Sequence, residues 1–136
     1  MAKKVIIFDF DGTIADTLPL LVNILNRLSG KYSYKTIEES ELTTLRGKTS
    51  KEILKGLGIS LLKLPFVVKS AKSEFLKELE LLKLVAGIKK VLLQLKKIGY
   101  KLGIVTSNSE ENVKKFLKVN NLPRFDFVYS VSPVSF

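Results

Sequence analysis

The stretch VIIFDFDGT, residues 5–13, decides the fold of this chain. Its first four residues are apolar and mostly β-branched, which is typical of a strand buried on both faces of a parallel sheet. Two carboxylates, Asp9 and Asp11, follow directly, with only Phe10 between them. In isolation, Asp-x-Asp-Gly is typical of a tight turn. The rest of the chain must therefore distinguish a turn from a reaction centre.

The composition limits the classes of function. The chain has 136 residues, of which 46% are hydrophobic, and this suits one small core with an insert. It contains no cysteine and no histidine, which excludes disulfides, thiolate and histidine metal sites, and Ser-His or Cys-His nucleophile pairs. No apolar run could span a bilayer, and the run after Lys4 meets Asp9 too soon for a secretory signal. We therefore expect a cytoplasmic protein without a membrane partner.

The strongly basic charge has two interpretations. The formal net charge is +10, from 23 basic and 13 acidic residues. The basic residues could form a nucleic-acid patch. However, they are mostly lysines spread along the chain without interleaved aromatic residues, which favours ordinary solvated helix faces. We therefore expect no nucleic-acid partner.

A long helical insert follows the first strand. Leucines at helical spacing predict a helix over residues 18–28 that Gly30 stops. Further helix starts are predicted by two capping boxes, Thr36 with Glu39 and Thr49 with Glu52, and by Pro65. We place this insert at residues 14–85 and the core at residues 1–13 and 86–136.

Strands and helices alternate after the insert. The heptad-like spacing after Gly87 predicts a helix that Gly99 ends, and KLGIVT, residues 101–106, predicts a second strand. Ser109 is expected to cap the next helix, and Phe125–Tyr129 to form a third strand. This alternation predicts an α/β fold with a parallel, Rossmann-like sheet of about three strands.

Polar residues end two of the predicted strands. Asp9 follows the first strand, and Thr106, Ser107 and Asn108 follow the second. Ligands bind at the carboxyl ends of parallel strands, and a helix N-terminus at that edge suits a phosphate. Carboxylates beside a phosphate require a cation, and oxygen ligands without His or Cys favour Mg²⁺.

The same residues suggest phosphoryl transfer chemistry. Asp9 could attack phosphorus and form an aspartyl-phosphate, while Asp11 could act as the general acid and base. Gly12 would let the backbone turn close to the phosphate, and the Thr106 hydroxyl and Ser107 N–H would hold phosphoryl oxygens. Asn108, the next residue, belongs to the same expected phosphate-binding set.

The sequence FDFDGTIADT resembles the first motif of the haloacid dehalogenase superfamily in its two-aspartate phosphatase form. GIVTSN resembles the second motif, and the insert resembles the helical cap of phosphoglycolate phosphatases and β-phosphoglucomutases. The resemblance implies that Asp9 is nucleophile and magnesium ligand, and that Asp11 is the acid/base and binds the metal through its backbone carbonyl. LRGKTSKEIL is similar to the cap segment that reaches substrate, which nominates Arg46 and Lys48. The implied substrate is a small phosphorylated metabolite.

The resemblance also implies a lysine and an acidic pair beyond the third strand, where this chain ends with VYSVSPVSF. We therefore expect a truncated core, with weak or no activity alone, and an uncovered first strand. Such an edge favours a homodimer or a complementing fragment. Two alternatives to a phosphatase stay open: a non-catalytic remnant that binds a phosphate ligand or protein partner, and a β-phosphoglucomutase-like phosphomutase.

Overall fold

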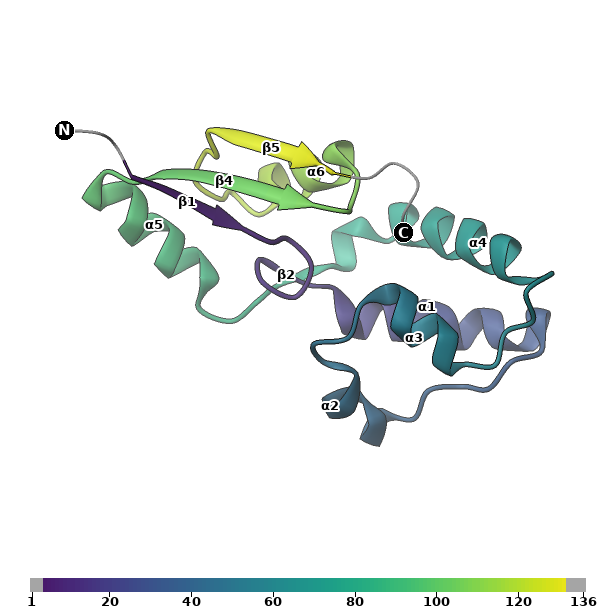
Figure 1. Ribbon diagram of the computed structural model, residues 1–136. Helices are drawn as coiled ribbons and strands as arrows, with labels where there is room; N and C mark the ends of the chain where they lie inside the picture. Colours follow the sequence, from purple (N-terminus) through teal and green to yellow (C-terminus); the bar gives the residue numbers. More distant parts are fainter. Residues whose placement is uncertain (1–3, 132–136) are drawn as a thin grey trace. The chain divides into compact units, whose positions relative to one another are not determined.

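The computed structural model describes residues 4–131, and its contacts divide the chain into two units. Of the described residues, a sheet unit contains residues 4–16 and 82–131, and a helical unit contains Thr17–Leu81 (Figure 1). Each unit has its own buried core. The last five residues of the ending VYSVSPVSF, residues 132–136, lie outside the described residues.

The sheet unit is built on three parallel strands. They are β1 (Val5–Phe8), β4 (Lys101–Thr106) and β5 (Phe127–Ser130), in the spatial order β1-β4-β5. Val5 is in register with Lys101, and Gly103 with Phe127. The predicted α/β class and parallel sheet are confirmed. The third strand begins two residues later than predicted, because the chain bends at Asp126, whose side-chain carboxylate accepts the Leu102 N–H.

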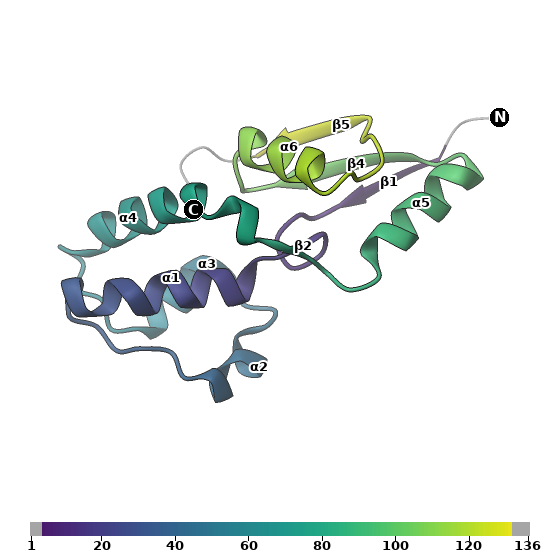
Figure 2. The same cartoon turned by 180° about the vertical axis from the view of Figure 1, so that it is seen from behind.

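Two helices alternate with the strands of this unit: one precedes β4, and the other connects β4 to β5 (Figure 2). Helix α5 (Ile88–Ile98) ends at Gly99, which has a left-handed φ of 106°, and α6 (Glu110–Val119) begins at Ser109. The Ser109 side chain accepts a hydrogen bond from the Asn112 N–H, as its N-cap position predicts. The buried apolar residues of the helices and of β4 contribute to the core of this unit: Ile88, Leu92, Leu102, Ile104, Val113 and Phe116.

Only one face of the sheet is covered within residues 4–131. Both connections run in the same direction along the sheet, and right-handed crossovers then place α5 and α6 on the same face. Burial agrees, because Leu102 and Ile104 on that face are fully buried. On the opposite face, Val5 and Ile7 are 47% and 58% exposed. The ring of Phe127 lies there over Gly103, where an added Cβ would come within 2.1 Å of it.

A short antiparallel ladder lies where the chain passes between the units. β2 (Ala15–Asp16) pairs with β3 (Lys83–Leu84), and Val85 N–H donates to Ile14 O at 2.9 Å. The sequence did not predict these strands, because two residues carry no periodicity. The ladder lies close to the expected insert borders at residues 14 and 85.

The helical unit contains four α-helices and two 3₁₀ turns among its described residues. They are α1 (Thr17–Tyr32), η1 (Glu39–Glu41), α2 (Leu42–Leu45), α3 (Ser50–Gly56), α4 (Leu64–Lys77) and η2 (Leu79–Leu81). The Thr49–Glu52 capping box and the start of α4 near Pro65 are confirmed. None of the helices within residues 4–131 is long and apolar enough to cross a bilayer.

Two predictions in the helical unit are wrong. Helix α1 continues past Gly30, and the left-handed residue at its end is Ser33, with a φ of 56°. A single glycine costs a helix only about 1 kcal/mol, which the packing of α1 offsets. The capping box of η1 is formed by Glu38 and Glu41 rather than by Thr36 and Glu39.

Candidate functional site

The chain makes a tight turn directly after β1, and Phe10 fixes it. Phe10 is fully buried and meets Phe116 edge to face, with ring centroids 5.2 Å apart. The Phe10 carbonyl accepts hydrogen bonds from the N–H groups of Thr13 and Ile14, at 3.2 and 2.9 Å. Gly12 takes a left-handed φ of 78°, which other residues adopt at a cost. Asp-x-Asp-Gly therefore does form a tight turn, and the same turn holds the two aspartates at the end of β1.

The two aspartates flank this buried anchor and stay near the surface. Asp9 is exposed, and its Oδ1 accepts a hydrogen bond from the Phe10 N–H at 2.7 Å. Asp11 is half-buried. An exposed carboxylate that is held from one side by a backbone N–H keeps its other oxygen accessible to an incoming group. This arrangement suits a nucleophile at the mouth of a site.

A second loop begins at the end of β4. Thr106, the last residue of the strand, is buried, and its Oγ1 accepts a hydrogen bond from the Asn108 N–H at 3.0 Å. Its carbonyl accepts the Val131 N–H at 2.8 Å. Ser107 is exposed, and the first turn of α6 follows. The N–H groups at this helix start, with the positive end of the helix dipole, favour an anion.

Asn108 joins the two loops. Its Nδ2 donates to Asp11 Oδ1 at 3.3 Å, while its Oδ1 accepts from the Ser109 N–H at 2.8 Å and from Asn112 Nδ2 at 3.3 Å. Two donors on the Oδ1 side determine which way the amide points, so the Nδ2 side must face Asp11. The carboxyl ends of β1 and β4 are therefore connected by a direct side-chain contact.

The structure places the predicted residues in two groups. Asp9, Asp11 and Gly12 follow β1, and Thr106, Ser107 and Asn108 follow the neighbouring strand β4.

Arg46 and Lys48 belong to the helical unit, on either side of Gly47, which has a left-handed φ of 88°. Both side chains are exposed, in the connection between α2 and α3. Their contact with substrate stays a prediction.

Two supporting residues were missed from the sequence. Asn112 donates to Asn108 Oδ1, and Ser130 Oγ donates to the Asn108 carbonyl at 2.8 Å. Ser130 could have been found, because it is a polar residue at the carboxyl end of the third strand, at the same edge as the other two groups. Asn112 carried no comparable signal, since a polar residue in the first turn of a helix is common.

The oxygen donors available for a metal are few. Within residues 4–131 there is no cluster of three or more His, Cys, Asp or Glu side chains. Asp9 and Asp11 supply two carboxylates close in sequence. Mg²⁺ commonly binds through one or two carboxylates together with waters and substrate phosphate, so this donor set fits Mg²⁺. A site with so few protein ligands is expected to bind the ion weakly in the absence of substrate.

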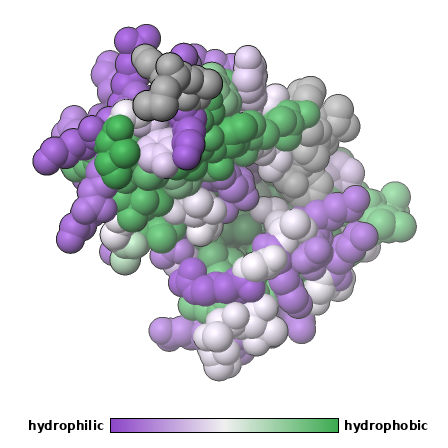
Figure 3. Space-filling view, turned by 60° about the vertical axis from the view of Figure 1, so that its left-hand side comes forward, coloured by the Kyte–Doolittle hydropathy of each residue, from purple (hydrophilic) through white to green (hydrophobic). Residues whose placement is uncertain are grey.

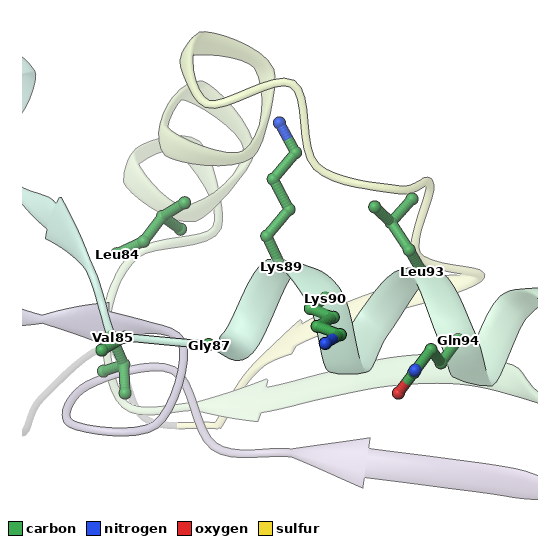
Figure 4. Close-up of a pocket in the computed structure, with 8 residues that line it drawn as sticks. Leu84, Val85, Gly87, Lys89, Lys90, Leu93 and Gln94 are labelled. Atoms are coloured by element: carbon green, nitrogen blue, oxygen red, sulfur yellow. The ribbon is translucent and has the colours of Figure 1, made fainter.

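A cavity elsewhere in the sheet unit does not contain these residues (Figure 4). It has a volume of about 570 Å³ and lies between the end of β3 and the first turns of α5. Its walls are mainly apolar, with Leu84, Val85 and Leu93. Lys89 extends from its rim, and its Nζ reaches the Asn120 carbonyl at 3.5 Å. The cavity therefore shares no lining residue with the site that contains the two aspartates.

Comparison with known proteins gives consistent relatives. Residues 6–136 match the model of the haloacid dehalogenase-like hydrolase family. A phosphoglycolate phosphatase of Synechococcus elongatus is 33% identical over 132 residues, which are 96% of this chain and 62% of that protein. The chain therefore spans less than two thirds of the length of this relative.

Solved structures agree with this result. A candidate haloacid dehalogenase-like hydrolase from Bacteroides fragilis superposes with a TM-score of 0.78 at 25% identity, covering 96% of this chain and 66% of that one. A candidate β-phosphoglucomutase from Thermotoga maritima superposes with a TM-score of 0.62 at 27% identity, covering 93% and 61%.

Proposed function

Because the chain belongs to the haloacid dehalogenase-like hydrolases, we propose that it serves, in the cytoplasm, the Mg²⁺-dependent hydrolysis of a small phosphorylated metabolite. The observation that carries the proposal is the pair of aspartates at the end of β1. Asp9 is exposed, and Asp11, two residues later, is held by Asn108 from the neighbouring strand end. This contact ties the turn that carries the two aspartates to the strand end whose loop would bind the phosphate.

In the proposed reaction an Asp9 carboxylate oxygen attacks phosphorus, and the bond from phosphorus to the ester oxygen breaks. Asp11 gives its proton to the departing alkoxide, which leaves as an alcohol. Water then attacks phosphorus, Asp11 takes the proton, and the bond from phosphorus to the Asp9 oxygen breaks, which releases orthophosphate. The second step restores both side chains, so the cycle balances.

Thr106 and Ser107 are proposed to hold the phosphoryl oxygens. The Thr106 Oγ1 already accepts the Asn108 N–H, so its own O–H remains available to donate to an anion. The Ser107 N–H lies in the loop that leads into α6, and the dipole of this helix favours negative charge there. Gly12, with its left-handed φ, would let the backbone of the turn after β1 approach the phosphoryl group without a Cβ in the way. Asn108 is assigned to orientation of Asp11, because both ends of its amide are occupied.

Magnesium and the helical unit complete the proposal. The Asp9 carboxylate and the Asp11 backbone carbonyl would hold Mg²⁺, which would neutralise negative charge between the Asp9 carboxylate and the phosphoryl group and leave the Asp11 carboxyl free for proton transfer. The helical unit is proposed to act as a cap, in which exposed Arg46 and Lys48 attract an anionic substrate.

Hydrolysis of p-nitrophenyl phosphate with Mg²⁺ tests the proposal. We expect turnover that EDTA abolishes and that Asp9→Asn reduces by at least a thousandfold. The matched control is Asp126→Asn, which changes an exposed aspartate of the same unit that lies at the other end of β4. If the Asp9→Asn variant and the unaltered chain showed equal turnover, the proposed phosphatase activity through Asp9 would be excluded.

A non-catalytic role is the second candidate. It is favoured by the small donor set, since residues 4–131 hold no cluster of three acidic side chains. In that case orthophosphate, titrated calorimetrically, would bind to the chain while p-nitrophenyl phosphate stays intact. A phosphomutase would instead isomerise a sugar phosphate and would release no orthophosphate. A colorimetric assay for orthophosphate would therefore stay negative with a sugar phosphate as substrate.

A further inference from the structure

Strand β1 is an edge strand in the described part of the chain. It pairs with β4 on one side, and no other strand within residues 4–131 pairs with it. The Lys4 carbonyl accepts the Lys101 N–H at 3.0 Å, so the polar groups of Lys4 point toward β4. Backbone direction alternates along a strand, so the N–H and C=O groups of Val5 and Ile7 point outward, away from the sheet. Such groups are a template for another strand.

The side chains of the same two residues are also uncovered. Val5 and Ile7 are 47% and 58% exposed, on the face of the sheet that α5 and α6 leave open. Tyr129 and Val131 on this face are 63% and 61% exposed. Figure 3 shows exposed hydrophobic side chains as a green band bordered by hydrophilic ones. An apolar edge and an apolar face therefore occur together, which is typical of an interaction surface.

We propose that two copies of this chain associate through their β1 strands, which pair antiparallel about a two-fold axis at Ile6. Val5 of one copy then lies opposite Ile7 of the other, and each pair exchanges two backbone hydrogen bonds. All four outward N–H and C=O sets of the two strands are satisfied in this register. A shift by one residue would turn inward-pointing groups to the partner, which excludes those registers. A shift by two residues would leave fewer of the Val5 and Ile7 groups opposite each other, and the cross-linking below distinguishes it.

A second copy fits this edge for three reasons. The outward residues are separated by one residue, so the edge is complementary to itself under a two-fold axis, as an isologous interface requires. The opposed side chains, valine and isoleucine, are a favourable β-branched cross-strand pair on the same face. The antiparallel direction also brings the exposed Lys4 of one copy to the Asp9 end of the other, where the charges are opposite. The product is a continuous six-stranded sheet.

Measurement of mass in solution tests the proposal. Light scattering after size exclusion is expected to give twice the chain mass of 15.3 kDa. Ile7→Lys places a charge at the pair, and Val5→Pro removes an outward N–H without loss of a bond to β4. Each is expected to raise the dissociation constant at least tenfold. Ile98→Lys, at a 72% exposed position of α5, is the matched control and should leave the mass unchanged.

Cross-linking tests the register itself. The chain has no cysteine, so a single introduced thiol is unambiguous. Ile6→Cys would place two thiols across the axis in a non-hydrogen-bonded pair, whose Cα atoms are about 4.5 Å apart and within disulfide range. Oxidation should give a covalent dimer at least tenfold faster than in Val5→Cys or Ile98→Cys.

A monomer at every concentration would overturn the proposal. A dimer that Ile7→Lys and Val5→Pro leave intact, or that Ile98→Lys abolishes, would overturn it as well. Equal oxidation rates in all three cysteine variants would exclude the β1 register. Circular dichroism of each variant shows whether the fold is retained, and the cysteine variants decide the result if a lysine or proline variant unfolds.

Discussion

The side-chain amide of Asn108 donates to the carboxylate of Asp11 at 3.3 Å, although 97 residues separate them in the sequence. The contact crosses from the end of β4 to the turn after β1, within one sheet unit. Asp11 is the residue to which the proposed reaction assigns both proton transfers. Its orientation therefore depends on a residue of the second motif, and this couples the two loops in one function.

The first prediction concerns this contact. Asn108→Ala removes a hydrogen bond to a carboxylate, and such bonds contribute about 1.5–3 kcal/mol. If the bond orients Asp11 for proton transfer, kcat for p-nitrophenyl phosphate should fall about ten- to hundredfold, with little change in KM. Steady-state kinetics with Asn23→Ala, at an exposed position of α1, provides the comparison. A change confined to KM would instead place Asn108 in substrate binding.

The second prediction concerns Thr106. Its buried hydroxyl accepts the Asn108 N–H, so Thr106→Val leaves that N–H without this partner while volume is retained. The free energy of unfolding in urea should fall by about 1–3 kcal/mol. Thr106→Ser keeps the hydroxyl and should recover much of the loss. A valine variant as stable as the unaltered chain would show that the hydroxyl serves only the ligand.

The strands of the sheet unit could be predicted from the sequence because their signals are local. VIIF and KLGIVT are apolar runs with polar residues directly after them, and parallel strands place such ends at one edge. The meeting of Asp11 with the loop after β4 follows from that rule. The orientation of the Asn108 amide does not, because it depends on Ser109 and Asn112 donating to one side.

Other features had no reliable signal in the sequence. β2 and β3 are two residues each, too short for any periodicity. Gly30 predicts a helix stop, but the tertiary packing of α1 outweighs the cost of one glycine and the helix continues to Tyr32. The Thr36–Glu39 pattern has the spacing of a capping box, yet Glu38 and Glu41 form the box in the structure. Several acidic residues lie close together here, so the same spacing also occurs two residues further on.

The third prediction concerns acid stability. The Leu102 N–H donates to Asp126 Oδ2 at 2.8 Å, and this bond, with Lys96 and Lys101 nearby, lowers the pKa of Asp126 from its usual 3.8. Because the folded-state pKa is the lower one, the stabilisation is present above about pH 4 and is lost as pH falls further. Melting temperatures should therefore decline below about pH 4. Asp126→Asn should flatten that decline, and an identical slope in the variant would contradict the assignment.

The fourth prediction concerns alkaline stability in the helical unit. Burial, with a smaller contribution from Tyr32, raises the pKa of Tyr34 from 10.0 to about 12, and its hydroxyl donates to the Leu25 carbonyl at 2.5 Å. Since the folded-state pKa is the higher one, the stabilisation is complete below pH 10 and is lost as pH rises from 10 to 12. Tyr34→Phe should cost about 1 kcal/mol at neutral pH and reduce this alkaline loss. Urea unfolding at pH 8 and pH 11 measures both effects, with Tyr129→Phe, at an exposed position, as the control. If both variants lose stability equally between the two pH values, the hydroxyl of Tyr34 is not the group responsible.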